Sequence, residues 1–273
     1  MGLRINTNVS SINTQRHLYN SSEAFSKSME KLASGLRINR AADDAAGLAI
    51  SEGLKGDIRA LNQAARNAAD GVSLVQTAEG ALDEVSNILL RMKELSEQSL
   101  NGTLSNTERG YLNSEFSALQ SEIDRIAGTT EFNGVNLLNG SLSVNIQVGI
   151  GTTAADSISV DQATAMTTAG LSLTGTIDTT ANATTAMGQI DSAMEAVNSA
   201  RAGFGAFQNR LESSIRNINN TSENLSAANS RIRDVDIAAE TSRMTSYQIL
   251  QQAGVSVLAQ ANMKSGLAMA LLG

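Results

Sequence analysis

Apolar residues recur at alternating steps of four and three along residues 190–232, the heptad spacing of a long helix that packs against other helices. At 1.5 Å per residue such a helix spans roughly 64 Å, more than the width of a compact small domain. A helix of this length cannot cover its own apolar stripe, so the pattern predicts partner helices from the same chain or from neighbouring subunits. The stripe positions are Ile190, Met194, Val197, Arg201, Phe204, Gln208, Leu211, Ile215, Ile218, Ser222, Leu225, Asn229 and Ile232.

Polar residues interrupt this stripe at Arg201, Gln208, Ser222 and Asn229. Buried polar residues in coiled coils can fix the register of the helices at some cost in stability. The same side chains could instead face solvent where the stripe drifts around the helix. The sequence leaves both interpretations open.

Helical spacing of apolar residues also marks both ends of the chain and the region before the heptads. A first helix is predicted over residues 5–36, broken at Gly35. A second, long helix is predicted over residues 58–95, with its end near the Asn-Gly pair at 101–102. A last helix is predicted over residues 247–271.

A third helix is predicted to begin at Ser105, because Ser105 and Glu108 have the spacing of a capping box. Its apolar positions follow clean helical spacing, and it is expected to stop at Gly128.

The apolar pattern changes to strict alternation over residues 142–148, which is typical of a β-strand with one buried face. Asn139-Gly140, just before it, is a strong β-hairpin signal. Residues 149–186 are rich in Thr, Ala and Gly and are expected to form short strands, turns and exposed loop.

Helices therefore occupy both ends of the chain, and the β-prone residues lie in the middle. Because the apolar stripes can be buried only if the two ends pack together, the chain is expected to fold back on itself. The predicted fold is mainly α: a long antiparallel helical hairpin or coiled-coil rod, with a small β-hairpin region at one tip and paired terminal helices.

The composition argues against a catalytic or metal-binding function. The 273 residues contain no proline, no cysteine and one histidine, His17, which excludes disulfides, thiolate metal sites and multi-histidine sites. Adjacent helical residues point about 100° apart, so Asp43 and Asp44 are expected to cap a helix or to form salt bridges opposite Arg37 or Arg40, and not to form a catalytic pair. No catalytic residue, metal ligand or cofactor site is predicted, and the chain is not expected to be an enzyme.

The net charge of −7 argues against nucleic acid as a partner. No segment approaches the ~20 apolar residues of a membrane span, so membrane insertion is not expected. The segment 241–273 carries only Arg243 and Lys264 as charges, which favours packing against partner helices over binding to a lipid surface.

Six stretches of the sequence resemble bacterial flagellin, in the same order along the chain. They are residues 32–51, 67–82, 132–138, 230–236, 258–262 and 271–273. The resemblance covers roughly residues 1–148 and 187–273 and implies a structural subunit of the flagellar filament. It also implies export of the unfolded chain through the flagellar type III apparatus, and a location outside the cell in the filament.

The resemblance implies three parts of the chain. Residues 1–43 with 236–273 would form an inner coiled-coil domain in the filament core. Residues 44–148 with 187–235 would form an outer helical rod with a β-hairpin, and residues 149–186 a short, variable surface segment.

The implied partners are other copies of this chain, the flagellar cap and hook-associated proteins, an export chaperone at the C-terminal helix, and a host Toll-like receptor. The expected subunit-interface residues are Ile5, Val9, Ile12, Leu36, Arg37, Arg40, Leu250, Val257, Leu258, Leu267 and Leu271. The expected rod-core residues are Leu89, Leu112, Phe116, Leu119, Ile123, Leu211, Ile215, Ile218, Leu225 and Ile232.

The stretch of the family that the receptor recognises matches this chain at Arg91, Leu95 and Glu115. Lys93 stands where the family often has Arg, and Glu97 where it often has Val. Loss of bidentate hydrogen bonding at one position and an added charge at the other imply weakened recognition.

Two other functions share some of these features. A hook-filament junction protein has similar terminal helices, but residues 32–51 and 230–236 match the flagellin pattern closely. A coiled-coil adhesin or membrane translocator secreted by a type III apparatus is the alternative from another class. Leakage of liposomes would indicate a translocator, and polymerisation into tubes would indicate flagellin.

Overall fold

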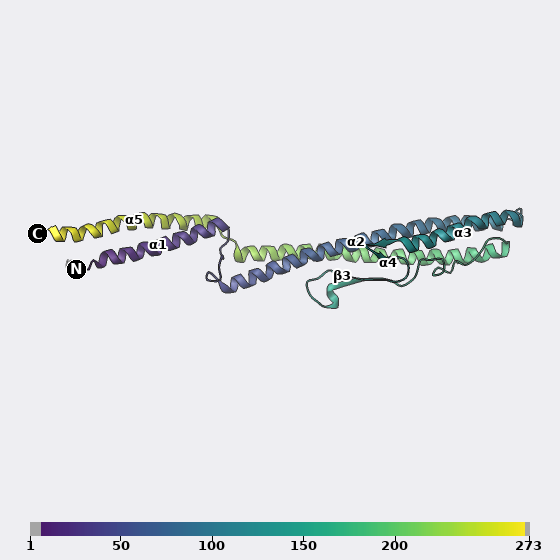
Figure 1. Ribbon diagram of the computed structural model, residues 1–273, viewed down its shortest axis with the longest axis horizontal. Coiled ribbons are helices and arrows are strands. Elements are labelled where there is room, and N and C mark those ends of the chain that lie inside the picture. Colours follow the sequence, from purple (N-terminus) through teal and green to yellow (C-terminus); the bar gives the residue numbers. More distant parts are fainter. Residues whose placement is uncertain (1–6, 271–273) are drawn as a thin grey trace. The chain divides into compact units, whose positions relative to one another are not determined.

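The computed structural model describes the backbone of residues 7–270 and the side chains of residues 7–263. The helices are α1 (Val9–Ser34), α2 (Ala45–Leu100), α3 (Asn106–Thr129), α4 (Thr180–Arg233) and α5 (Ile237–Ala270), with a short 3-10 helix at Ala154–Asp156 (Figure 1). The strands are β1 (Glu131–Phe132), β2 (Val135–Asn136), β3 (Leu142–Gln147) and β4 (Ser157–Gln162). The mainly helical fold with small antiparallel strand pairs is as the apolar spacing predicts.

The chain divides into two compact units. We call residues 1–56 with 224–273 the terminal unit and residues 57–223 the central unit. The terminal unit extends further into the long helices α2 and α4 than the expected inner domain, 1–43 with 236–273. The assignment of inner, outer and variable parts in a filament stays a prediction.

In the terminal unit, α1 and α5 lie side by side and antiparallel (Figure 1). Asn8 begins α1: its side chain accepts a hydrogen bond from the Ser11 N–H and donates one to the Ala261 carbonyl of α5. The Ser11 hydroxyl donates to Asn262. These bonds hold the start of α1 against α5.

The other end of α1 is fixed by the backbone. Gly35 ends the helix in the left-handed conformation (φ 72°), as the predicted break at this glycine requires. Leu36 then pairs with Asp234 in an isolated antiparallel bridge, and the Arg37 N–H donates to the Arg233 carbonyl. These contacts join the segment after α1 to the segment before α5 within the terminal unit.

The start of α2 was predicted too late. The helix begins at Ala45 and not at residue 58, because Asp44 caps it by accepting a hydrogen bond from the Gly47 N–H. Asp43 accepts from the backbone N–H groups of Asn39 and Arg40, and these bonds hold the pKa of Asp43 below its usual value. The capping role is confirmed for Asp44, whereas Asp43 closes the turn that precedes α2.

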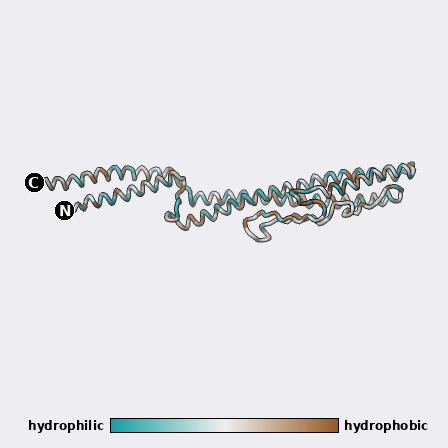
Figure 2. The backbone as a smooth tube through the Cα atoms, in the orientation of Figure 1, coloured by the Kyte–Doolittle hydropathy of each residue, from teal (hydrophilic) through white to brown (hydrophobic). Residues whose placement is uncertain are grey.

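The central unit packs α2, α3 and α4 around one hydrophobic core, with the strands against it (Figure 2). α2 and α4 run antiparallel, as the ion pairs of Lys93 with Asp191 (2.6 Å) and of Arg201 with Asp83 (3.2 Å) show. The capping box at the start of α3 is confirmed, since Ser105 and Glu108 bond each other's backbone N–H groups. α3 ends at Thr129, one residue beyond the predicted stop.

From Ile190 to Ile218 the heptad stripe of α4 is buried at every second position. Ile190, Val197, Phe204, Leu211 and Ile218 are buried, the positions between them are half-buried, and the stripe beyond Ile218 is half-buried throughout. None of the four polar interruptions is fully exposed: Arg201 pairs with Asp83, Gln208 donates to Glu212, and Ser222 lies 3.5 Å from Asn62. α4 begins at Thr180, ahead of the first heptad position, because Ala183 and Ala186 continue the same buried side.

Among the expected rod-core residues, Leu89, Phe116, Ile123, Leu211 and Ile218 are buried. The other five are half-buried: Leu112, Leu119, Ile215, Leu225 and Ile232.

The hairpin signal was assigned to the wrong Asn-Gly pair. The tight turn joins β1 to β2 at Asn133-Gly134, where both residues have positive φ (51° and 78°) as a two-residue hairpin turn requires. Asn139-Gly140 lies instead in a loop before β3, and β3 pairs with the distant β4 from Leu142↔Gln162 to Gln147↔Ser157.

Residues 149–186 are not merely exposed loop. They supply β4 and several side chains that lie in the hydrophobic core of the central unit. These are Ile158, Val160, Met166, Leu171, Leu173, Ile177, Ala183 and Ala186. The weak periodicity of the segment hid this role, because single apolar residues in irregular backbone leave no repeating pattern.

Candidate assembly surface

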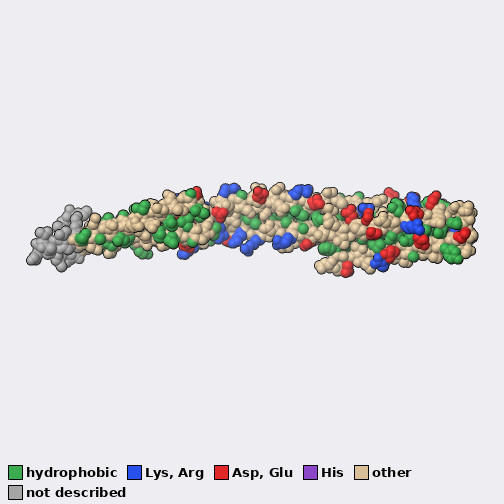
Figure 3. Space-filling view, turned by 90° about the horizontal axis from the view of Figure 1, so that it is seen from above, with side chains coloured by type: hydrophobic (Ala, Val, Ile, Leu, Met, Phe, Trp, Pro, Cys, Tyr) green, Lys and Arg blue, Asp and Glu red, His purple; other side chains and the backbone are tan. Residues whose placement is uncertain are grey.

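The terminal unit exposes large apolar side chains along α1, α5 and the start of α2. Among the described residues they are Val9, Ile12, Tyr19, Met29, Ile50, Ile237, Ile249, Leu250, Val255, Val257 and Met263. The central unit exposes Leu90, Tyr111, Val135 and Ile150. Hydrophobic side chains are visible over the terminal unit in the space-filling view (Figure 3).

Ser11 and Ser28 are the buried positions of α1, and a Cβ on Gly254 of α5 would lie 3.2 Å from Leu18 Cδ1. Leu18, Phe25 and Leu258 are half-buried, so larger side chains also take part in the packing of this pair. Many other large apolar side chains of the two helices stay exposed. An apolar surface of this extent indicates a site of association.

The structure places most of the expected interface residues on this surface. Val9, Ile12, Leu250 and Val257 are each at least half exposed. Leu36 and Leu258 are half-buried. Ile5, Leu267 and Leu271 lie outside the residues whose side chains are described.

The two basic residues expected at the interface are exposed but already have partners. The Arg37 guanidinium donates to the Ile232 carbonyl through Nη2 (2.5 Å) and Nε. Arg40 forms an ion pair with Glu30 (2.8 Å). These contacts connect the segment after α1 to its surroundings in the same unit.

The three expected receptor residues do not form one exposed set. Arg91 of α2 forms ion pairs with Glu115 of α3 (2.8 Å) and with Glu94 (3.0 Å), and these partners raise the pKa of Arg91. Leu95, by contrast, is 1 % exposed and packs in the core of the central unit, so its side chain cannot contact a protein at this surface.

Two buried charged residues escaped the sequence analysis. Arg109 of α3 is 6 % exposed, and its guanidinium donates to the Ser99 and Asn101 carbonyls, which fastens the turn between α2 and α3. Glu240 of α5 is 5 % exposed and pairs with Arg243 (3.3 Å). No sequence signal distinguishes either residue from the exposed charges around it.

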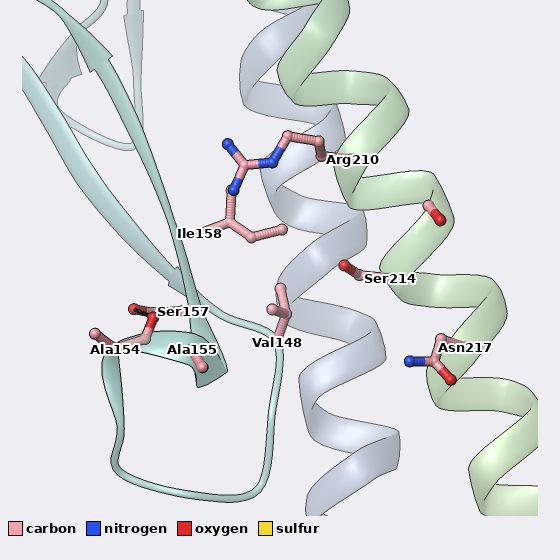
Figure 4. A pocket seen from close by; sticks show the side chains of 9 residues that line it. Val148, Ala154, Ala155, Ser157, Ile158, Arg210, Ser214 and Asn217 are labelled. Carbon is pink, nitrogen blue, oxygen red and sulfur yellow. Dashed lines mark hydrogen bonds between the residues drawn. The ribbon is translucent and has the colours of Figure 1, made fainter.

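An open groove of about 440 Å³ lies between the β3–β4 region and α4 (Figure 4). Arg210, Ser214 and Asn217 border it from α4, and Val148 and Ile158 border it from the strand side. Arg210 is its one charged side chain and also lies 6.0 Å from the Phe207 ring centroid. The groove holds no pair of acid and base groups that could act on a substrate.

The described residues contain no cluster of three or more His, Cys, Asp or Glu side chains that could hold a metal ion. None of the helices, over those same residues, is long and apolar enough to cross a membrane. His17 is exposed on α1.

Comparisons with known proteins identify the family. Residues 5–143 match the model of the bacterial flagellin N-terminal helical region, and residues 187–272 match that of the bacterial flagellin C-terminal helical region. A flagellin of Halalkalibacterium halodurans is 47 % identical over 274 residues, covering 98 % of this chain and 99 % of the relative. A flagellar filament 33 kDa core protein of Treponema phagedenis is 44 % identical, with the same coverage of the two chains.

A solved structure agrees with these matches. The crystal structure of Bacillus cereus flagellin superposes with a TM-score of 0.51 at 33 % identity, covering 60 % of this chain and 94 % of that chain. The two flagellin models together span more than half of the sequence and leave only a middle segment and the extreme ends unmatched. The chain belongs to the bacterial flagellin family.

Proposed function

We propose that this protein is a structural subunit of the bacterial flagellar filament, located outside the cell, and that it polymerises through the terminal unit. The observation that carries the proposal is the set of large apolar side chains that α1 and α5 leave exposed, although the buried positions of α1 are Ser11 and Ser28. The relatives named as flagellins and filament core proteins support the same function. A structural role without enzyme activity follows from this assignment.

Polymerisation into a filament requires a contact between different surfaces of successive copies, because a contact between identical surfaces closes into a dimer. The outward side chains lie on several sides of the α1–α5 pair, among them Val9 and Ile12 on α1 and Ile249, Leu250 and Val255 on α5. Several copies can therefore surround one pair. Burial of these side chains on assembly supplies the driving force.

A single charge placed on this surface tests the proposal. Leu250→Glu places a carboxylate at a position of the terminal unit where the leucine is 50 % exposed. Ile150→Glu places one at a position of the central unit where the isoleucine is 49 % exposed. We expect Leu250→Glu to abolish polymerisation, because the assembled contact would bury an unpaired charge. Ile150→Glu is expected to polymerise like the parent.

The measurement is sedimentation of polymer grown from purified monomer, with electron microscopy of the pellet. Circular dichroism of each monomer checks that the helices are retained. Filaments of normal yield from Leu250→Glu would contradict assembly through this surface.

Further partners are proposed on the basis of family membership. They are the flagellar cap and hook-associated proteins, and an export chaperone that binds α5 before the chain leaves the cell unfolded through the type III apparatus. The exposed apolar residues of α5 support the chaperone proposal, since they need cover until assembly. Relatives named as flagellins and filament core proteins favour this function over that of a hook-filament junction protein.

Recognition by a host Toll-like receptor is proposed at Arg91 and Glu115, which lie together on the exposed side of α2 and α3. Loss of charge-assisted hydrogen bonds is expected to lower the receptor response to Arg91→Ala about tenfold. Arg125→Ala is the matched control, because Arg125 forms a similar exposed ion pair with Glu122. A parent monomer that gives no more reporter signal than buffer would overturn the proposal.

A further inference from the structure

Three Asn-Gly pairs lie in turns of the central unit, at Asn101, Asn133 and Asn139, and all three asparagines are exposed. An asparagine followed by glycine is chemically labile, because no side chain shields the glycine nitrogen from the asparagine amide. The structure gives the three asparagines different surroundings.

The side chain of Asn139 is held by two donors. Its Oδ1 accepts a hydrogen bond from the Ser141 N–H (3.0 Å) and another from the Ser141 hydroxyl (2.6 Å). The bond to the Ser141 N–H closes a ring of atoms that includes Asn139 Cγ and the Gly140 nitrogen. The bond holds the Asn139 amide on the side of the chain that carries the Gly140–Ser141 peptide. Among the described residues, no hydrogen bond engages the Gly140 N–H.

Asn101 is a natural control for Asn139. The local sequences are nearly identical, Leu-Asn-Gly-Thr at 100–103 and Leu-Asn-Gly-Ser at 138–141. The Oδ1 atom of Asn101 accepts only the Thr103 N–H, at 3.2 Å, in the described structure. Both side chains accept a bond from the N–H two residues on, and only Asn139 also accepts one from a hydroxyl. The backbone carbonyl of Asn101 in addition accepts bonds from the Leu104 N–H and from Arg109.

Asn133 is the second control. It lies in the hairpin turn between β1 and β2 with a positive φ of 51°. Its Oδ1 accepts no hydrogen bond from the part of the chain that the structure describes, so nothing orients or polarises its amide.

We propose that Asn139 is a site of self-deamidation, promoted by the Ser141 hydroxyl, and that it reacts faster than Asn101 and Asn133. The Gly140 nitrogen loses its proton and attacks Asn139 Cγ, and the carbonyl oxygen Oδ1 takes up the negative charge. The two Ser141 donors stabilise this oxyanion, as donors do in enzymes that cleave amides. The carbonyl bond then re-forms as the Cγ–Nδ2 bond breaks, and Nδ2 takes up a proton from water and leaves as ammonia. The proton lost by the Gly140 nitrogen goes to hydroxide, so the two proton transfers balance, and a five-membered succinimide remains.

Water hydrolyses the succinimide at either carbonyl, giving aspartate or isoaspartate at position 139. The net reaction replaces an amide by a carboxylate and adds one negative charge. Isoaspartate also inserts a methylene into the backbone next to Leu138, whose carbonyl accepts the Met166 N–H (2.8 Å). Both side chains are buried, so this product is expected to weaken the attachment of the loop to the core.

The test uses purified full-length protein incubated in mildly alkaline buffer without any cofactor. Peptide mapping by mass spectrometry follows the amide-to-acid change at all three asparagines in one sample, so each site serves as a standard for the others. The Ser141 hydroxyl already bonds Oδ1 before the reaction, and this bond strengthens as the oxyanion forms, which changes the rate by about two- to tenfold. Asn139 is therefore expected to react about two- to tenfold faster than Asn101, and Asn133 slowest.

Variants of the donor separate its role from mere exposure. Ser141→Ala should slow Asn139 to the rate of Asn101 without changing the other two sites, and Ser141→Thr, which keeps a hydroxyl, should restore the rate. Equal rates at Asn101 and Asn139 in the parent would overturn the proposal, as would an unchanged Asn139 rate in Ser141→Ala. The outcome does not depend on polymerisation.

Discussion

The terminal unit and the central unit use apolar residues in opposite ways. In the central unit, Phe116, Phe204, Leu82 and Leu89 lie in one continuous core with almost no exposure. In the terminal unit, Ile38 is the single buried hydrophobic residue of the described part, and eleven large apolar side chains are exposed. Two units of one helical protein thus differ in where they place their large side chains.

This difference shows that a pair of helices can pack together and still leave most of its large apolar side chains exposed. Ile38 is the single buried hydrophobic residue among the described residues of the terminal unit, and the stability of a unit rises with the apolar area that it buries. The central unit therefore has the larger apolar core, and the exposed side chains of the terminal unit are the ones proposed to be buried by other copies. Three substitutions test how far the contrast holds.

The largest effect is expected in the core of the central unit. Phe116→Ala removes a side chain that is 1 % exposed and should lower the free energy of unfolding by about 3–5 kcal/mol, the range for deletion of a buried aromatic ring. Tyr111→Ala, on the same helix but at a residue that is 74 % exposed, should change it by less than about 0.5 kcal/mol. Denaturant unfolding followed by circular dichroism measures both. Similar losses for the two variants would show that the stability of the central unit does not depend on its buried core, which is one half of the contrast.

An intermediate effect is expected when a small residue between α1 and α5 is enlarged. Ser28→Leu adds bulk at a position that is 3 % exposed, and overpacking of this kind costs about 1–3 kcal/mol. Hydrogen exchange of α1 in the monomer should speed up accordingly. Ser26→Leu, two residues away at an exposed position of the same helix, should leave the exchange unchanged. If Ser28→Leu instead slowed exchange, the pair would be underpacked and the contrast would weaken.

The smallest effect concerns the cap of α3 in the central unit. Hydrogen bonds from Ser105 lower the pKa of Glu108 below its ordinary 4.5, so charged Glu108 stabilises the fold above pH 4.5. That stabilisation is lost as the pH falls through the depressed folded pKa. Glu108→Gln should therefore be slightly less stable than the parent at neutral pH, and denaturation curves of the two should converge in acid. A gap that persists in acid would show that the carboxylate charge is not the cause.

The sequence predicted the helices well where their signals are local. The capping box at Ser105, the break at Gly35 and the heptads of α4 each depend on neighbours a few residues away, and each is confirmed. The start of α2 was missed because residues 45–57 lack a strong apolar stripe. The capping aspartate Asp44 was recognised as a cap but not connected to that helix.

The candidate sites were predicted less completely. Residue type and spacing placed Val9, Ile12 and Leu250 on an association surface, and the structure exposes all three. Residue type also suggested Leu95 as a surface contact, yet a leucine on a helix of α2's length is buried or exposed according to which helices lie beside it. α2 has α3 and α4 on that side, so Leu95 is in the core.

By itself the sequence determined the helical character of the chain, the ends of several helices, and its membership in a polymer-forming family. The helical character and the helix ends follow from periodicity and capping, which act over short distances along the chain, and the family follows from the stretches that resemble flagellin. Only the tertiary structure decided that residues 149–186 enter the core, that Arg109 is buried where it bonds the Ser99 and Asn101 carbonyls, and that α1 buries Ser11 and Ser28 while it exposes Val9 and Ile12. Burial depends on contacts between residues that are far apart in the sequence, and no local pattern specifies those contacts.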